Sequence, residues 1–213
     1  MRAPAAIAAL LAFGCGEETR APLVFTVVRT ELTHEADVRI DLADPLAARA
    51  RVLEAAGTRS INPTWLGAGP WQTVAVHRAD IPPEQALAAG RTFIRQGGAL
   101  HLDARLGAGD RGTFMGGVAA TGAERALLEL RVEDPETLNA RFVVRVHAVE
   151  GGRHRDATPH YLRRAVPRGT YRVWLDVPPS GGRYLVEVRT VDRSGEVCGR
   201  AWSSPLAVER PWL

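Results

Sequence analysis

The chain has 213 residues, of which 46% are hydrophobic and 24% are charged, and this composition excludes a largely disordered protein. Its 27 basic residues are all Arg and face 24 acidic residues, so the net charge of +3 gives little support for nucleic-acid binding. The absence of Lys excludes Schiff-base and Ser-Lys chemistry. The length is sufficient for two small domains.

The first 15 residues have the features of a targeting signal. Arg2 gives a positive start, and residues 5–13 are nine apolar residues, too few for a membrane span of ~20 residues. The sequence LAFGC, which ends at Cys15, resembles a bacterial lipobox. The resemblance implies a signal peptide over 1–14, lipidation of Cys15, a tether over 15–22 and an anchored place in the bacterial cell envelope, at the outer membrane facing the periplasm or the surface. A simple cleaved signal peptide is the alternative.

Residues 23–106 are expected to form a first Ig-like β-sandwich. Apolar or alternating runs predict strands at 24–28 and 38–42. Pro82-Pro83-Glu84 predicts a short helix that ends at Gly90, and residues 100–105 alternate as a closing strand. Strand pairing between Trp71 and Phe93 stays open.

Four segments of this region, VRIDL, RVLEAAG, TWLG and ALAAGRTF, occur in that order. They resemble the Ig-like module of the flagellar hook-capping protein. The resemblance implies a sandwich in which Trp65 and Phe93 fill the aromatic positions.

An internal repeat supports two domains. Residues 36–53 align with residues 126–144 at an offset of 126 − 36 = 90. Because the second copy leads into an alternating strand, we expect a strand at 51–55 as well. A period near 90 fits two tandem β-sandwiches, with GAGDRG at 107–112 as the linker and the second domain at 113–213.

The segment 169–208 contains three alternating runs separated by turn residues, which predicts three antiparallel strands joined by two turns. The alternation places Tyr184 inward and Trp174 outward. The run from Leu175 through YLVEV, together with the closing AWSSPLAV, resembles the last strands of a fibronectin type III domain. The resemblance implies a scaffold used for adhesion, spacing and recognition, with Val132 where the family places its core Trp.

Sequence motifs for catalysis are missing from the chain. It has no Gly-x-Ser-x-Gly elbow, no phosphate-binding loop and no zinc-ligand spacing, so we expect no catalytic, cofactor-binding or metal-binding residues. If Cys15 carries lipid, Cys198 has no disulfide partner, and its place on a predicted strand indicates a buried core thiol.

Two features indicate a binding surface. Between residues 153 and 172, Asp156 is the single acid among six arginines, and Trp174 follows on the outward side of its strand. Arg binds carboxylates and phosphates bidentately. An outward Trp is expected to pack on the neighbouring domain, to form a protein interface or to stack on a sugar ring, in that order. Solvated loop charges are the plainer alternative. The candidate residues are Trp174, Arg172, Arg153, Arg155, Arg163, Arg164 and Arg168.

These observations predict an all-β protein, two tandem Ig-like and fibronectin type III-like sandwiches after a signal peptide. The expected function is that of a non-catalytic, membrane-anchored envelope lipoprotein that binds or spaces partner proteins. A carbohydrate-binding or cell-wall-binding lipoprotein, with Trp65, Trp71 or Trp174 as a sugar platform, is the alternative, and a hydrolytic enzyme is the third. Expected partners are envelope proteins or anionic or carbohydrate envelope polymers, and not nucleic acid.

Overall fold

The computed structural model describes residues 23–27, 71–97, 99–107, 112–137, 139–150 and 153–211, and these are mostly β-strand. Two short helical segments are present in these ranges, α2 (Pro83–Ala88) and the 3-10 turn η2 (His160–Leu162). Helix α2 confirms the helix predicted after Pro82. The targeting signal, the strands expected at 38–42 and 51–55, and Trp65 lie outside the described residues.

Nine strands form the larger sheet, sheet A: β1 (Leu23–Val27), β2 (Trp71–Arg78), β3 (Thr92–Gln96), β6 (Val118–Ala120), β8 (Arg141–Glu150), β9 (Arg153–Asp156), β11 (Gly182–Val191), β12 (Val197–Ser203) and β13 (Leu206–Glu209). Their order is β1-β2-β3-β12-β11-β13-β6, and β8 followed by β9 extends from the other side of β11. All pairs are antiparallel except β13 with β6.

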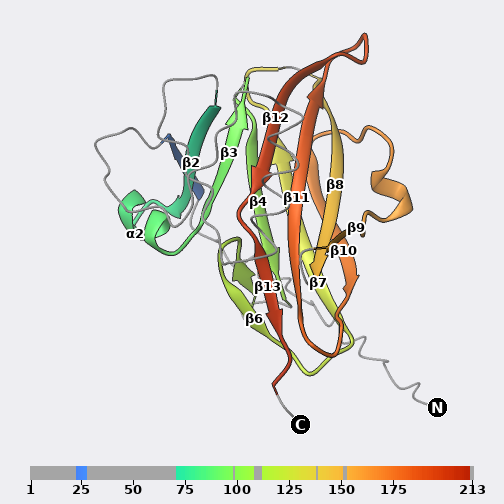
Figure 1. Cartoon of the computed structure of the whole chain (residues 1–213). Helices are drawn as coiled ribbons and strands as arrows, with labels where there is room; N and C mark the ends of the chain where they lie inside the picture. Colours follow the sequence, from blue (N-terminus) through green and yellow to red (C-terminus); the bar gives the residue numbers. More distant parts are fainter. Residues whose placement is uncertain are drawn as a thin grey trace, which may run out of the picture.

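Four strands form the smaller sheet, sheet B: β4 (His101–Leu106), β5 (Thr113–Phe114), β7 (Arg125–Glu133) and β10 (Gly169–Asp176). Their order is β10-β7-β4-β5, and every pair is antiparallel. In Figure 1, β11, β12 and β8 of sheet A lie in front, and β4, β7 and β10 lie behind them.

One hydrophobic core lies between the two sheets. Every second residue of β7 points inward, and Leu128, Leu130 and Val132 are fully buried. Val144 of β8 and Val186 of β11 face them from sheet A in the same cluster. Burial of Val132 confirms that a branched aliphatic side chain fills this inward position.

Tyr184 is also a core residue, with 1% of its surface exposed, as predicted. Its hydroxyl donates a hydrogen bond of 2.6 Å to the backbone carbonyl of Asp176 at the end of β10. The bond ties β11 in sheet A to β10 in sheet B. Trp174 is 62% exposed, which confirms its predicted outward direction.

The predicted arrangement of three neighbouring strands is correct only for the last two. Strands β11 and β12 pair antiparallel, whereas β10 pairs with β7 and lies in the other sheet. The connection after Val177 contains Pro178 and Pro179, which lack the N–H needed for continued pairing. It also contains Gly181 at φ +80°, so the chain crosses between the sheets here.

The linker expected at 107–112 does not separate two sandwiches in the described part of the chain. The closing strand expected at 100–105 is present as β4, but it pairs with β7 along six residues. Strand β3 pairs with β12, and the single core includes Val74 and Phe93 as well as Leu206. Alternation specifies which face of a strand is buried, but not which strand lies beside it.

The prediction that Cys198 is a core residue is wrong. Its side chain is exposed, and its thiol donates to the carbonyl of Thr190 at 3.5 Å. Ala201 of the same strand lies in the core, so alternation turns Gly199 inward and Cys198 to the outer face of sheet A. Desolvation raises the pKa of the thiol, which disfavours a reactive thiolate.

Candidate functional site

Trp174 lies on β10, the edge strand of sheet B. The neighbouring Val173 and Leu175 are buried in the core, so the alternation of the strand directs the indole to the outer face. Its cross-strand partner on β7 is Leu127, which is half-buried. Trp174 therefore presents an apolar side chain to solvent in the middle of a strand.

Paired charges lie on both sides of Trp174 along β10. Arg172 Nε lies 3.4 Å from Glu129 Oε2, and Arg125 Nε lies 3.1 Å from Asp176 Oδ1. Both pairs join β10 to β7, and both are largely exposed, so each contributes little to stability. They do compensate the charges next to the indole, so its surroundings are polar but close to neutral.

Strand β9 brings two further arginines to this edge. Asp156 bonds to Arg145 on the outer face of sheet A, with 3.1 Å between Oδ2 and Nη1. Because side chains alternate along a strand, Arg153 and Arg155 point to the other side, where sheet B lies. Both are exposed.

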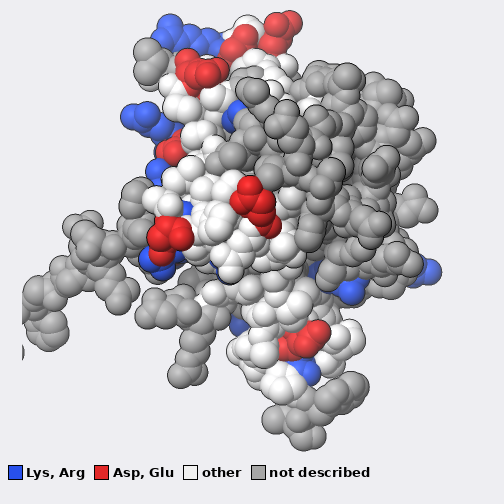
Figure 2. Space-filling view, turned by 90° about the vertical axis from the view of Figure 1, so that its left-hand side faces the viewer, with Lys and Arg blue, Asp and Glu red and all other residues white. Residues whose placement is uncertain are grey.

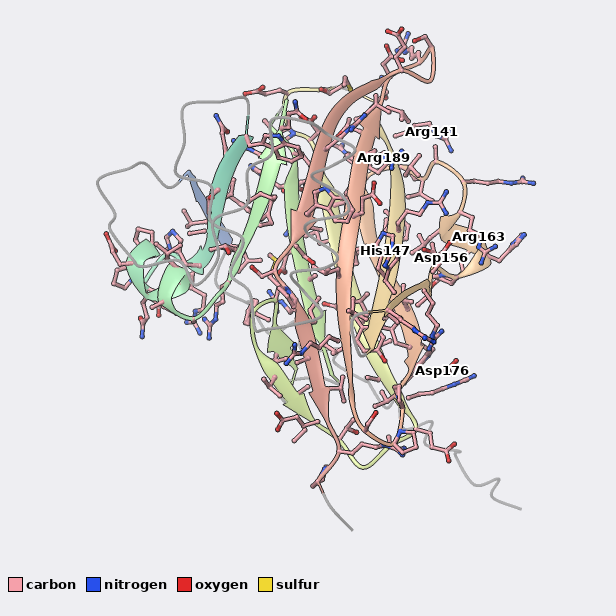
Figure 3. The ribbon with its side chains drawn as sticks, in the orientation of Figure 1. Arg141, His147, Asp156, Arg163, Asp176 and Arg189 are labelled. Carbon is pink, nitrogen blue, oxygen red and sulfur yellow. The ribbon has the colours of Figure 1, made fainter. Side chains whose placement is uncertain are left out.

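Asp156 and Arg163 lie at the same edge of the molecule (Figure 3). Burial acts to raise the pKa of Asp156, but hydrogen bonds from Thr158 and the charges of Arg145 and Arg163 lower it overall. Arg163 Nε also donates to the Thr158 carbonyl at 3.3 Å. Arg163 is therefore already engaged by its own loop.

Tyr161 is a second exposed aromatic residue, with 53% of its surface accessible. Its hydroxyl donates to the carbonyl of Arg172 at 2.5 Å, so η2 is bonded to β10 close to Trp174. Burial raises the pKa of Tyr161, which keeps the hydroxyl protonated as a donor. Sequence reasoning missed this residue because it lies in a loop without periodicity.

The six predicted arginines are all exposed, but they are spread along the edge. Arg168 borders a pocket of about 340 Å³ that is also lined by Asp134 and Arg141. Six residues of extended strand, about 20 Å, separate Arg168 from Trp174. We name these residues together the β10 edge surface: Arg153, Arg155, Tyr161, Arg163, Arg164, Arg168, Arg172 and Trp174.

The β10 edge surface carries excess positive charge. Among the side chains that the structure describes, no acid lies at ion-pair distance from Arg155, Arg164 or Arg168. Figure 2 views the other end of the molecule, where α2 and β2 lie. There the described basic and acidic residues are interspersed. The β10 edge surface differs from that end of the molecule, because all of its charged residues are Arg.

A different cluster of polar residues is buried on the outer face of sheet A. His147 of β8 lies 3.1 Å from Glu187 of β11, measured from Nε2 to Oε2. Arg189 donates to the other carboxylate oxygen at 2.5 Å from Nη2 and 2.7 Å from Nε. The His147 ring stacks on Trp202, with 5.8 Å between the centroids. Figure 3 labels His147 and Arg189 on this face.

This cluster stabilises the sheet and is not placed for catalysis. Burial acts to raise the pKa of Glu187, but the bonds from His147 and Arg189 lower it overall, so the carboxylate stays ionised. The side chains of His147 and Glu187 are each 3% exposed, so a substrate does not reach them. The nearby hydroxyl of Ser203 is engaged by the backbone N–H of Val186. Sequence alone did not pair these residues because they are 40 positions apart.

Trp71 is 4% exposed and packs in the interior, so it does not form part of a sugar platform. Among the residues that the structure describes, no group of three or more His, Cys, Asp or Glu is placed to hold a metal ion. Comparisons with protein families, with curated proteins and with solved structures find no match for this chain.

Proposed function

We propose that this chain is a lipid-anchored envelope protein whose β-sandwich binds a partner protein through the β10 edge surface. The observation that carries the proposal is Trp174, which is 62% exposed on a strand whose start and surroundings also carry exposed arginines. Trp and Arg are enriched among the residues that dominate binding energy at protein interfaces. The paired charges next to the indole have the character of a polar rim around such an anchor.

We further infer that the sandwich from β4 to β13 is fibronectin type III-like. Strands β4, β7 and β10 on one side and β9, β8, β11 and β12 on the other are the arrangement expected of such a domain. The bond from Tyr184 to the Asp176 carbonyl supports the inference, because a tyrosine at this corner is typical of Ig-like sandwiches. The family uses this fold as a scaffold, which fits a binding role and does not specify the partner.

Anchoring through Cys15 is a further part of the proposal and is supported by the LAFGC sequence. In the described residues, neither α2 nor η2 has the length and apolar character of a helix that crosses a membrane. Cys15→Ser is expected to move the protein from the membrane fraction to the soluble fraction. Unchanged fractionation of this variant would contradict the anchor.

Carbohydrate binding is the second candidate. Tyr161 favours this candidate, because its exposed ring is bonded to Arg172 on the same strand as the exposed ring of Trp174. Stacking on sugar rings uses such exposed rings. The two candidates differ in what the indole of Trp174 touches.

Site-specific photo-crosslinking in intact envelopes tests both candidates. A photoreactive phenylalanine is placed at Trp174 and, as the control, at Val197, which is 42% exposed on the other sheet. The expected result is a protease-sensitive adduct at 174 and none at 197. An adduct that resists protease but yields to glycan-degrading enzymes supports the carbohydrate alternative. Equal labelling at the two positions, or none at either, would overturn a role for the β10 edge surface.

A further inference from the structure

Strand β10 has one side without a strand neighbour. It pairs with β7 over its eight residues in continuous register, and within the described residues no strand pairs with its other side. The other strands at the sheet margins are shorter, with two to five residues in β5, β6, β9 and β1. A long, regular edge strand is a template for pairing with another chain.

The backbone of Trp174 faces this open side. Val177 N–H bonds to the Glu124 carbonyl, which places the odd-numbered residues of this segment toward β7. The even-numbered residues therefore direct their N–H and C=O groups outward. The carbonyls of Arg172 and Asp176 do point away from β7, because each accepts a hydrogen bond from a tyrosine hydroxyl.

The hydroxyls of Tyr161 and Tyr184 occupy backbone carbonyls on the unpaired side of β10 and so limit its open length. Tyr184 is buried, and its bond to the Asp176 carbonyl is part of the core. Tyr161 is exposed, so its bond to the Arg172 carbonyl can exchange for another donor. The amide and carbonyl of Trp174 lie between them, as a donor and acceptor pair of the kind that a neighbouring antiparallel strand uses.

The charge along the same edge indicates the occupant. Arg153 and Arg155 point from β9 toward the side of sheet B, and Arg168 lies at the start of β10. Because Arg168 and Trp174 are separated by six residues of extended strand, about 20 Å, a ligand that reaches both is extended and not compact. Arginine pairs well with carboxylates.

We propose that the open edge of β10 accepts an extended, acidic segment of a partner protein, which adds to sheet B as a further strand. Main-chain hydrogen bonds to Trp174 give this mode its affinity, and alternate side chains give specificity. Acidic side chains pair with Arg153, Arg155 and Arg168, while an apolar side chain packs on the indole. This inference rests on the proposed function and specifies the class of partner.

The first test uses the purified full chain in detergent and a fluorescein-labelled octapeptide of alternating Glu and Val with both ends capped. Trp174→Ala removes the indole, and Trp174→Pro also removes the outward N–H without affecting a bond to β7. We expect binding about tenfold weaker for Pro than for Ala, because one bond to the added strand is lost. Arg155→Ala is expected to weaken binding, and Arg193→Ala, in the exposed turn between β11 and β12, is the matched control.

A second measurement leaves the protein unchanged. Peptides N-methylated at one or the other set of alternate residues are compared, since only one set directs its N–H groups at β10. One series is expected to bind and the other not. Hydrogen exchange then checks the location, because the Trp174 amide is expected to exchange fast in the free protein and to gain protection with peptide, while the Val173 amide stays protected throughout.

Equal binding of both N-methylated series would overturn strand addition. Equal binding of a Lys-Val peptide and the Glu-Val peptide would overturn an acidic occupant. The crosslinking result then decides separately about the proposed function. If a protein adduct forms at Trp174 but both N-methylated series bind equally, the proposed function stands without strand addition. Selective peptide binding without an adduct at Trp174 supports the open edge and contradicts the proposed function.

Discussion

The outer face of sheet A and the outer face of sheet B at β10 both carry charged and aromatic side chains, but they use them differently. On sheet A, Glu187, His147 and Trp202 are buried and contact one another. At β10, Trp174 and Arg172 are exposed. Polar groups that are buried and bonded to each other fix the register of a sheet, whereas exposed groups on an open edge are available to a partner. The same residue types thus contact one another in the interior on one sheet and, in the function that we propose, serve recognition on the other.

Removal of the central carboxylate of sheet A is expected to have the largest effect. Glu187→Ala leaves His147 and Arg189 without their shared partner and should lower the free energy of unfolding by roughly 3–5 kcal/mol. Urea unfolding at neutral pH measures the loss. A change below about 1 kcal/mol would show that the cluster does not hold β8 and β11 together.

Glu187→Gln gives the pH dependence of the same site. The pKa of Glu187 is lowered in the folded state, so its stabilising contribution is present above the unfolded pKa and is lost as pH falls through the folded pKa. The difference between wild type and Glu187→Gln should therefore shrink under acid conditions. A difference that does not depend on pH would contradict a role for the carboxylate charge.

Tyr184→Ala is expected to lower stability by about 3 kcal/mol, since it leaves a cavity between the sheets. Tyr184→Phe is the matched control, because it keeps the ring and removes only the bond to the Asp176 carbonyl. Its cost should be about 1 kcal/mol. Similar losses for both variants would assign the stability of this corner to the hydrogen bond and not to packing.

On sheet B, Asp103 is expected to give a pH dependence of stability opposite to that of Glu187. Burial raises the pKa of Asp103 even though Arg105 acts to lower it, and among the described residues its Oδ1 has no hydrogen-bond partner. A raised folded pKa means that its stabilising contribution is present below the unfolded pKa and is lost as pH rises through the folded pKa. Asp103→Asn should therefore add about 1 kcal/mol at neutral pH and less in acid, as thermal melts at several pH values would show.

Trp174→Ala is expected to have the smallest effect on stability, less than about 1 kcal/mol, because no internal cavity forms when a surface side chain is removed. Binding to the acidic peptide should weaken, while the denaturant midpoint remains close to that of wild type. A loss of stability as large as that of Tyr184→Ala would mean that the indole belongs to the core.

The sequence predicted the faces of the strands well. Tyr184 is inward, Trp174 is outward and Val132 fills a core position, because alternation in a strand follows directly from backbone geometry. The helix after Pro82 was predicted for similar local reasons. These features depend on residues that are close together in the chain.

Strand neighbours were not predictable in the same way. The pairing of β3 with β12, the crossing from β10 to β11 and the contact between His147 and Glu187 all join distant segments. Cys198 was misplaced because it shares the outward face of β12 with Arg200, and the face that packs on the core is set by the distant strands that pair with β12. The candidate arginines were identified by composition, but their spread along an edge depends on these same long-range pairings.

The pairing of β3 with β12 also bears on the timing of folding. In this register Ile94 lies opposite Trp202, a separation of 202 − 94 = 108 residues. The ribosome has therefore made most of the chain before these strands can meet, and contacts between distant segments slow folding. A chain that remains unfolded while it is being synthesised is suited to passage through a narrow translocation channel. Late closure of sheet A is thus a kinetic property that would suit the exported protein that we propose.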